Sequence, residues 1–137
     1  MRGLGGEPGI KVRRWIGRTM TDEELIDYAL ERLEGKTGAD RDAEFKTVIC
    51  MVLLDEKGDI IAEKSAAGAL KGHILKAADP VRIKGFPFES LFFADEYGML
   101  LGNLHRMSDD EKRGNAFNNH RERALEEAVL VIKKWMA

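Results

Sequence analysis

The stretch FKTVICMVLL, residues 45–54, is the most strongly apolar and β-branched part of the chain. A run of this composition predicts a strand that is covered on both faces. Residues 55–59, DEKGD, have the charges and the glycine of a hairpin turn, and residues 60–67 predict the returning strand. We expect Gly68 and Gly72 to mark a bend or a bulge after that strand.

Capping signals predict helices before and after these strands. Residues 21–24 (TDEE) and residues 108–111 (SDDE) are capping boxes, in which a hydroxyl and a carboxylate satisfy the first amide groups of a helix. A last helix follows Asn118 or Asn119, either of which can cap it. This order predicts an α+β fold, with a twisted, mainly antiparallel or mixed sheet flanked by helices, in a single domain of residues 1–137.

The composition is that of an ordinary globular protein, with 44% hydrophobic and 34% charged residues. A net charge of −2 and an isoelectric point near 6.0 argue against a nucleic acid as the main partner. Cys50, the only cysteine, is predicted to be a small buried core residue, and a cytoplasmic location is expected. The longest apolar run, residues 48–54, is too short to cross a membrane.

Two segments carry the side chains of a candidate binding site: GFPFESLFF, residues 85–93, and NHR, residues 119–121. An aromatic face can hold a flat heterocycle while one carboxylate and nearby donors meet its polar edge. Phe86, beside a glycine, is the best candidate for the ring platform. The other aromatic side chains are better explained as alternating core residues of a strand at residues 90–94. Nucleobase recognition is therefore the leading hypothesis.

The remaining histidines offer no second site. His73 and His105 have no evident partner in the sequence and are expected to be structural or exposed. His105 and Asp109 are spaced like two metal ligands on a helix, but no third ligand completes the set. No metal-binding or catalytic residue is therefore predicted.

Several segments resemble one known family in the correct order. Residues 4–10 (LGGEPGI) are similar to its LGGxPGV segment, residues 43–49 (AEFKTVI) to its AxFxxV strand, and residues 85–93 to its GFGYDPIFF segment. Residues 119–125 (NHRERAL) are similar to its SHRGKAL segment. The chain resembles the inosine triphosphatase family, whose members are house-cleaning pyrophosphatases acting on non-canonical purine nucleoside triphosphates.

The resemblance implies roles for four residues in base binding. Phe86 would stack on the purine, and Glu89 would take the place of the aspartate that reads the base edge. His120 and Arg121 would donate to the base carbonyl. Such a pocket suits a 6-keto purine of the inosine or xanthosine type, because adenine has a donor where these bases have an acceptor.

The resemblance also implies weaker contacts and a cofactor. Lys112 and Arg14 fall where the family has residues near the ligand, and Mg²⁺ is expected to assist the release of pyrophosphate. The family's phosphate loop and metal-binding residues precede its LGG segment, so we expect this chain not to contain them. We expect the apolar strand to favour a homodimer or a complex with a complementary chain. The function implied is that of a purine nucleoside triphosphate pyrophosphatase; the alternatives are an inactive nucleotide-binding module and a protein-interaction module.

Overall fold

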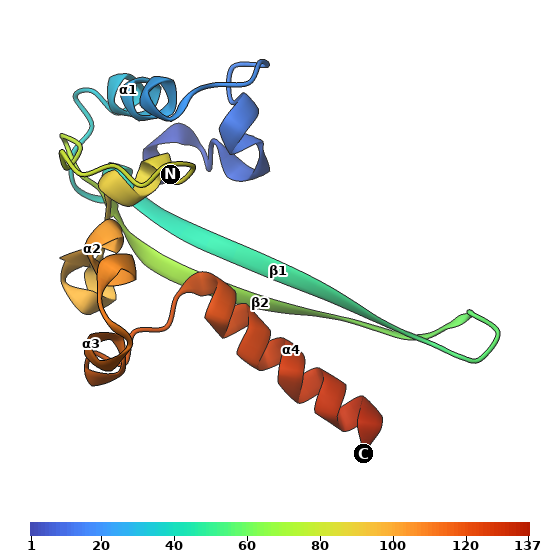
Figure 1. The fold of residues 1–137 in the computed structure, drawn as a ribbon. Coiled ribbons are helices and arrows are strands. Elements are labelled where there is room, and N and C mark those ends of the chain that lie inside the picture. The colour runs from blue at the N-terminus through green and yellow to red at the C-terminus, as the bar shows by residue number, and fades with distance from the viewer. The chain divides into compact units, whose positions relative to one another are not determined.

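The computed structural model describes all of residues 1–137. Short 3₁₀ turns join its regular elements (Figure 1). The helices and strands are α1 (Asp22–Arg32), β1 (Asp42–Leu54), β2 (Ile60–Ile74), β3 (Phe92–Ala94), β4 (Met99–Leu100), α2 (Leu101–Arg106), α3 (Asp109–Gly114) and α4 (His120–Met136).

The strands form one sheet in the order β1-β2-β3-β4. β3 pairs antiparallel with β2, with Phe92 opposite Ile74, and β4 pairs antiparallel with β3, with Leu100 opposite Phe93. The hairpin turn between β1 and β2 closes where the Asp55 N–H donates to the Asp59 carbonyl at 2.9 Å. The predicted α+β class with an antiparallel sheet is therefore confirmed.

β2 runs further than the sequence predicted, because it continues through Gly68 and Gly72 to Ile74. A Cβ atom on Gly72 would lie 2.0 Å from the Phe93 carbonyl oxygen of the neighbouring strand. The glycines allow close approach of other backbone here and do not end the strand.

The chain divides into two compact units. The first comprises residues 1–44 and 71–117, and the second comprises residues 45–70 and 118–137. The organisation of residues 1–137 as a single domain stays a prediction.

The first unit is built around α1 and a buried arginine. The Thr21 hydroxyl accepts from the Glu24 N–H at 3.2 Å and the Glu24 carboxylate accepts from the Thr21 N–H at 2.8 Å, as the capping box predicts. The Arg18 guanidinium, together with the Thr21 amide, lowers the pKa of Glu24 to about 2. Arg41 is buried, and its guanidinium donates to the Leu33, Ile74 and Leu75 carbonyls. Burial lowers the pKa of Arg41.

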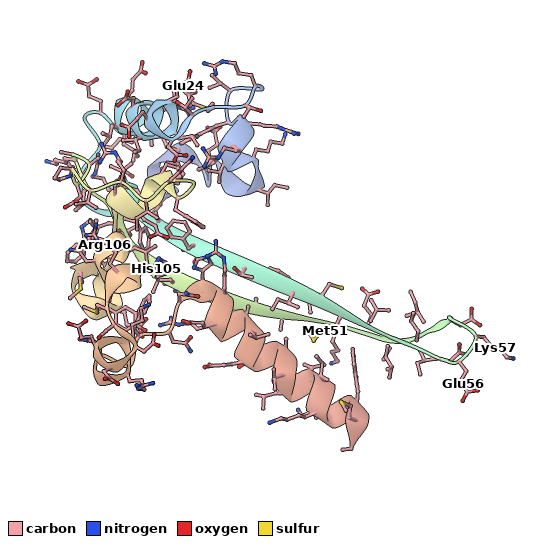
Figure 2. The ribbon with its side chains drawn as sticks, viewed as in Figure 1. Glu24, Met51, Glu56, Lys57, His105 and Arg106 are labelled. Carbon is pink, nitrogen blue, oxygen red and sulfur yellow. The ribbon has the colours of Figure 1, made fainter.

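In the second unit α4 packs along the hairpin of β1 and β2. Its core contains Met51, Ala66 and Ala128, with Ile49, Val131 and Trp135 packed around them. Figure 2 shows the Met51 side chain between the hairpin and α4, with Glu56 and Lys57 at the hairpin turn. These apolar contacts hold the helix on one face of the strands.

The opposite face of β1 corrects a prediction made from its sequence. Val48 is 59% exposed, Val52 and Leu54 are also exposed, and so is Cys50. The expectations of a strand covered on both faces and of a buried cysteine are therefore wrong. The odd-numbered side chains of β1 point to α4, and no element of this unit covers the even-numbered ones.

Close packing at Gly68 gives a first prediction. A Cβ atom there would lie 2.2 Å from the His120 carbonyl oxygen and 2.4 Å from the Ala124 nitrogen, both in the α4 backbone. We expect Gly68→Ala to displace α4 and lower the free energy of unfolding by about 2–3 kcal/mol, measured by chemical denaturation with Trp135 fluorescence. The control is Gly114→Ala, where a Cβ meets nothing within 4 Å. Equal stability of the two variants would contradict this packing.

Candidate functional site

The predicted ring platform lies on a short turn rather than at the end of a strand. Phe86 follows Gly85, which has φ +85°, and precedes the 3₁₀ turn Pro87–Ser90. The Ser90 hydroxyl donates to the Pro87 carbonyl at 2.8 Å, closing this turn on itself. The Phe86 side chain is 45% exposed. β3 begins only at Phe92, so the strand predicted from residue 90 is shorter than expected.

An ion pair holds the start of this turn against α1. The Asp22 carboxylate accepts from the Gly85 N–H at 2.8 Å, and the Arg13 guanidinium donates to the Gly85 carbonyl at 3.0 Å. Arg13 and Asp22 also form an ion pair with an N–O distance of 2.5 Å. The Gly85 N–H, aided by the Arg13 guanidinium, lowers the pKa of the Asp22 carboxyl.

The sequence did not predict that Arg13 and Asp22 both bind the backbone of Gly85. Asp22 belongs to the predicted capping box of residues 21–24, and nothing near Arg13 or Asp22 in the sequence points to Gly85. Their partner lies 72 and 63 residues away along the chain, respectively. Only a fold that brings α1 next to the turn makes the two side chains part of the site.

Glu89 is buried in the same turn and is paired with a histidine. Its Oε1 atom lies 2.8 Å from Nδ1 of His105 on α2, and the Glu89 side chain is 8% exposed. Oε2 of Glu89 is buried and has no hydrogen-bond partner. A buried polar atom without a hydrogen-bond partner lowers the stability of the fold by about 1–3 kcal/mol, and by more when the group is charged. This partner of His105 was not predicted, because Glu89 lies 16 residues earlier in a different element.

The second pair of predicted residues opens α4. The Asn119 side chain caps this helix by accepting from the Arg121 N–H at 2.9 Å and the Glu122 N–H at 3.0 Å. His120 is buried, and its ring stacks on Phe45 with 5.2 Å between the ring centroids. Arg121 is exposed. The helix start was predicted correctly, and the stacking of His120 on Phe45 was not foreseen.

The predicted site residues are divided between the two units. Phe86 and Glu89 belong to the first unit, and His120 and Arg121 belong to the second. The convergence of these four around one ligand stays a prediction. The two weaker candidates also lie in the first unit: Arg14, which is exposed, and Lys112, which is half-buried on α3.

The acidic and histidine side chains of residues 1–137 form no group of three or more that could hold a metal ion. His73, for which the sequence indicated no partner, lies 2.6 Å from an Asp95 carboxylate oxygen. Both side chains of this pair are substantially exposed. The pair therefore lies at the surface, where the His73 ring also contacts Phe93 with 5.1 Å between the ring centroids.

The Asp22 contacts generate a prediction about acid stability. Because the folded state lowers the Asp22 pKa, its contribution is fully present above the unfolded value of about 3.9 and is lost as the pH falls through the folded value. We expect Asp22→Asn to lower the free energy of unfolding by about 1 kcal/mol at pH 7. The loss should shrink toward pH 3, measured by denaturant titrations. Asp27→Asn, an exposed change on the same helix, is the control and should have little effect. A loss that does not depend on pH would contradict the role of the charge.

Comparison with known proteins identifies relatives over nearly the whole chain. The sequence model of the Ham1 family matches residues 1–130. A dITP/XTP pyrophosphatase from Thermus thermophilus is 34% identical over 130 residues, covering 95% of this chain and 56% of the relative. A dITP/XTP pyrophosphatase from Coxiella burnetii is 30% identical over 129 residues, covering 94% of this chain and 59% of the relative. The chain thus spans little more than half the length of these relatives.

Solved structures show the same similarity. A HAM1 protein from Coxiella burnetii has a TM-score of 0.71 at 26% identity, covering 96% of this chain and 61% of that one. The Staphylococcus aureus Ham1 protein has a TM-score of 0.70 at 27% identity, covering 95% and 61%. None of the helices has the length and apolar composition of a membrane-spanning segment.

The sequence match and the shared fold agree: this chain belongs to the Ham1 family.

Proposed function

We propose that this chain recognises the base of non-canonical purine nucleoside triphosphates of the inosine and xanthosine type. The proposed binding residues are Phe86 as a platform, Glu89 as an acceptor, and His120 with Arg121 as donors. Relatives named dITP/XTP pyrophosphatases support this substrate class. Glu89 would accept from an N–H group of the base, and His120 and Arg121 would donate to its 6-keto oxygen.

The single observation that carries the proposal is that the Glu89 carboxylate has one oxygen without a hydrogen-bond partner. Its Oε2 atom is buried without a hydrogen-bond partner, three residues after the half-exposed ring of Phe86. An N–H group of a bound ligand would satisfy this oxygen and remove the cost of leaving it without a partner. A 6-keto purine has such an N–H group on the edge that also carries the carbonyl.

The proposed reaction is hydrolysis to the nucleoside monophosphate and pyrophosphate. When bound, Mg²⁺ would neutralise the charge of the phosphates and assist the attack of water. No group of three or more histidine, cysteine or acidic side chains of this chain lies together, so we assign none of its residues as a Mg²⁺ ligand. We therefore assign base binding and orientation to this chain and derive no catalytic step from it.

The alternative is a nucleotide-binding or protein-interaction module of the same fold that does not catalyse hydrolysis. The observation that favours an interaction role is the exposed apolar face of β1, formed by Val48, Cys50, Val52 and Leu54. Apolar side chains gathered on one strand face favour association with another surface.

Calorimetric titration with inosine triphosphate tests the proposed base site. We expect inosine triphosphate to bind at least about tenfold more tightly than adenosine triphosphate, because adenine would leave buried groups without partners. Phe86→Ala and His120→Ala should each weaken the binding of inosine triphosphate by about tenfold or more. Val81→Ala, an exposed apolar change outside the proposed site, is the control.

The titrations and an assay of pyrophosphate release decide between the alternatives. Equal affinity for inosine and adenosine triphosphates, or unchanged affinity in both variants, would rule out the proposed site. Release of pyrophosphate from inosine triphosphate with added Mg²⁺ would favour the enzyme, and specific binding without release would favour the nucleotide-binding module.

The exposed face of β1 leads to a proposed homodimer. Association of two copies through this face would remove Val48, Val52 and Leu54 from water. We expect sedimentation at micromolar concentration to show a dimer, and Val52→Lys to weaken the dimer by about tenfold or more, because it would bury a charge. Glu63→Lys, an exposed change on β2, is the control. A wild-type monomer that melts cooperatively would exclude this association.

A further inference from the structure

β1 is the terminal strand of the sheet, so one of its edges has no strand beside it. The strand is 13 residues long, and its exposed side chains include Val48, Val52 and Leu54. Such an edge presents a row of backbone N–H and C=O groups that can pair with another strand. Charged residues and prolines protect many natural edges, and residues 47–54 contain neither. This edge of β1 is therefore open to pairing.

An apolar stripe runs along one flank of α4. Its members recur at intervals of four, three and four residues, and all of them are exposed: Leu125, Val129, Ile132 and Met136. This spacing keeps the four side chains on one side of a helix. The stripe is separate from the face of α4 that packs on the hairpin, which contains Ala128, Val131 and Trp135.

The stripe lies on the side of α4 where β1 has its open edge. The opposite flank carries Arg123, whose guanidinium donates to the Ala69 carbonyl of β2 at 3.0 Å. Leu125 follows Arg123 by two positions, a rotation of about 200° around the helix, so it points away from β2. α4 packs on both strands, through Met51 of β1 and Ala66 of β2, and Figure 1 shows it alongside the hairpin. The open edge and the stripe therefore lie on the same side of the second unit.

We propose that the open edge of β1 and the stripe on α4 together bind a second copy of this chain. β1 pairs antiparallel with β1 of the second copy, and the two α4 helices lie antiparallel on one face of the combined sheet. The contact is the same on both copies, as a two-fold interface requires. It uses the edge of the strand and not its exposed face, so it is distinct from the association proposed above and forms without it.

The spacing of strands and helices fits this arrangement. Pairing of the two edges places the centres of the two hairpins two strand spacings apart, which is about 9.6 Å. Helices that pack against each other have axes about 8–10 Å apart. A helix over each hairpin therefore comes within packing distance of its copy, with the two apolar stripes between them.

The charges beside the stripe favour a second copy in the antiparallel orientation. Glu126 lies in the first half of α4 and Lys133 in the second half, and both are exposed. Because they are seven residues apart, they border the stripe on the same side of the helix. In an antiparallel pair Glu126 of each copy meets Lys133 of the other, whereas in a parallel pair each would meet its own like charge.

Analytical ultracentrifugation of the Val52→Lys chain tests this contact, because that change disrupts the association proposed through the face of β1. We expect reversible dimers to form as the concentration rises from about 10 to about 500 µM, the range of a small interface. Val129→Lys, within the stripe, should weaken the dimer by about tenfold or more, because its charge would face the apolar stripe of the other copy. Leu130→Lys, an exposed apolar position outside the stripe, is the matched control. Thermal melting establishes that each variant is folded.

Charge reversal and hydrogen exchange test the two parts of the arrangement. Glu126→Lys and Lys133→Glu should each weaken the dimer by about threefold or more, and the double variant should recover the affinity. The Asp55 N–H donates across the hairpin, so the N–H groups of even-numbered residues of β1 point to the open edge. We expect the N–H groups of Val48 and Cys50 to exchange more slowly in the dimer, as measured by NMR.

Several results would overturn this contact. A chain that stays monomeric over the whole concentration range would do so, and would leave the edge and the stripe to a partner of different sequence. Equal effects of Val129→Lys and Leu130→Lys would exclude the stripe. A double charge variant that dimerises as weakly as the single variants would exclude the antiparallel order, and unchanged exchange at Val48 and Cys50 would exclude pairing of the strands.

Discussion

The buried guanidinium of Arg41 is the interaction on which the first unit depends. It donates to carbonyl oxygens of Leu33, Ile74 and Leu75, which lie after α1 and at the end of β2. Arg41 itself immediately precedes β1. A single charge thus joins the segment after α1 to the end of β2, which lies 33 residues beyond Arg41, through donors to backbone carbonyl groups. Removing it would take a buried donor away from all three carbonyl groups.

The geometry of the turn at residues 86–90, which we propose to bind the base, follows from this junction. The Leu75 N–H donates to the Leu91 carbonyl at 2.8 Å, so the segment after the turn is fixed directly beyond the Arg41 contacts. The start of the turn is held at Gly85 by the Arg13–Asp22 ion pair. Between these anchors His105 holds the carboxylate of Glu89. Phe86 remains partly exposed in a segment whose backbone is otherwise restrained, as a rigid platform requires.

The second unit has a different physical character. It is a long hairpin covered by one helix, and the other face of β1 leaves apolar side chains in contact with water. The chain spans little more than half the length of the Ham1-family relatives it matches. The proposed base recognition involves the turn of the first unit, and the proposed association involves the hairpin of the second unit.

The sequence alone determined what depends on neighbouring residues. The capping boxes at Thr21 and Ser108 and the cap at Asn119 are contacts over two or three positions, so they and the α+β class were predicted correctly. The residues of the proposed base site were chosen from the sequence, but their surroundings in the fold were not predicted. The Glu89–His105 pair and the exposure of Cys50 depend on which elements meet. Only the tertiary structure decided these features, because they arise from contacts between residues distant in the chain and from a strand face that no element of its unit covers.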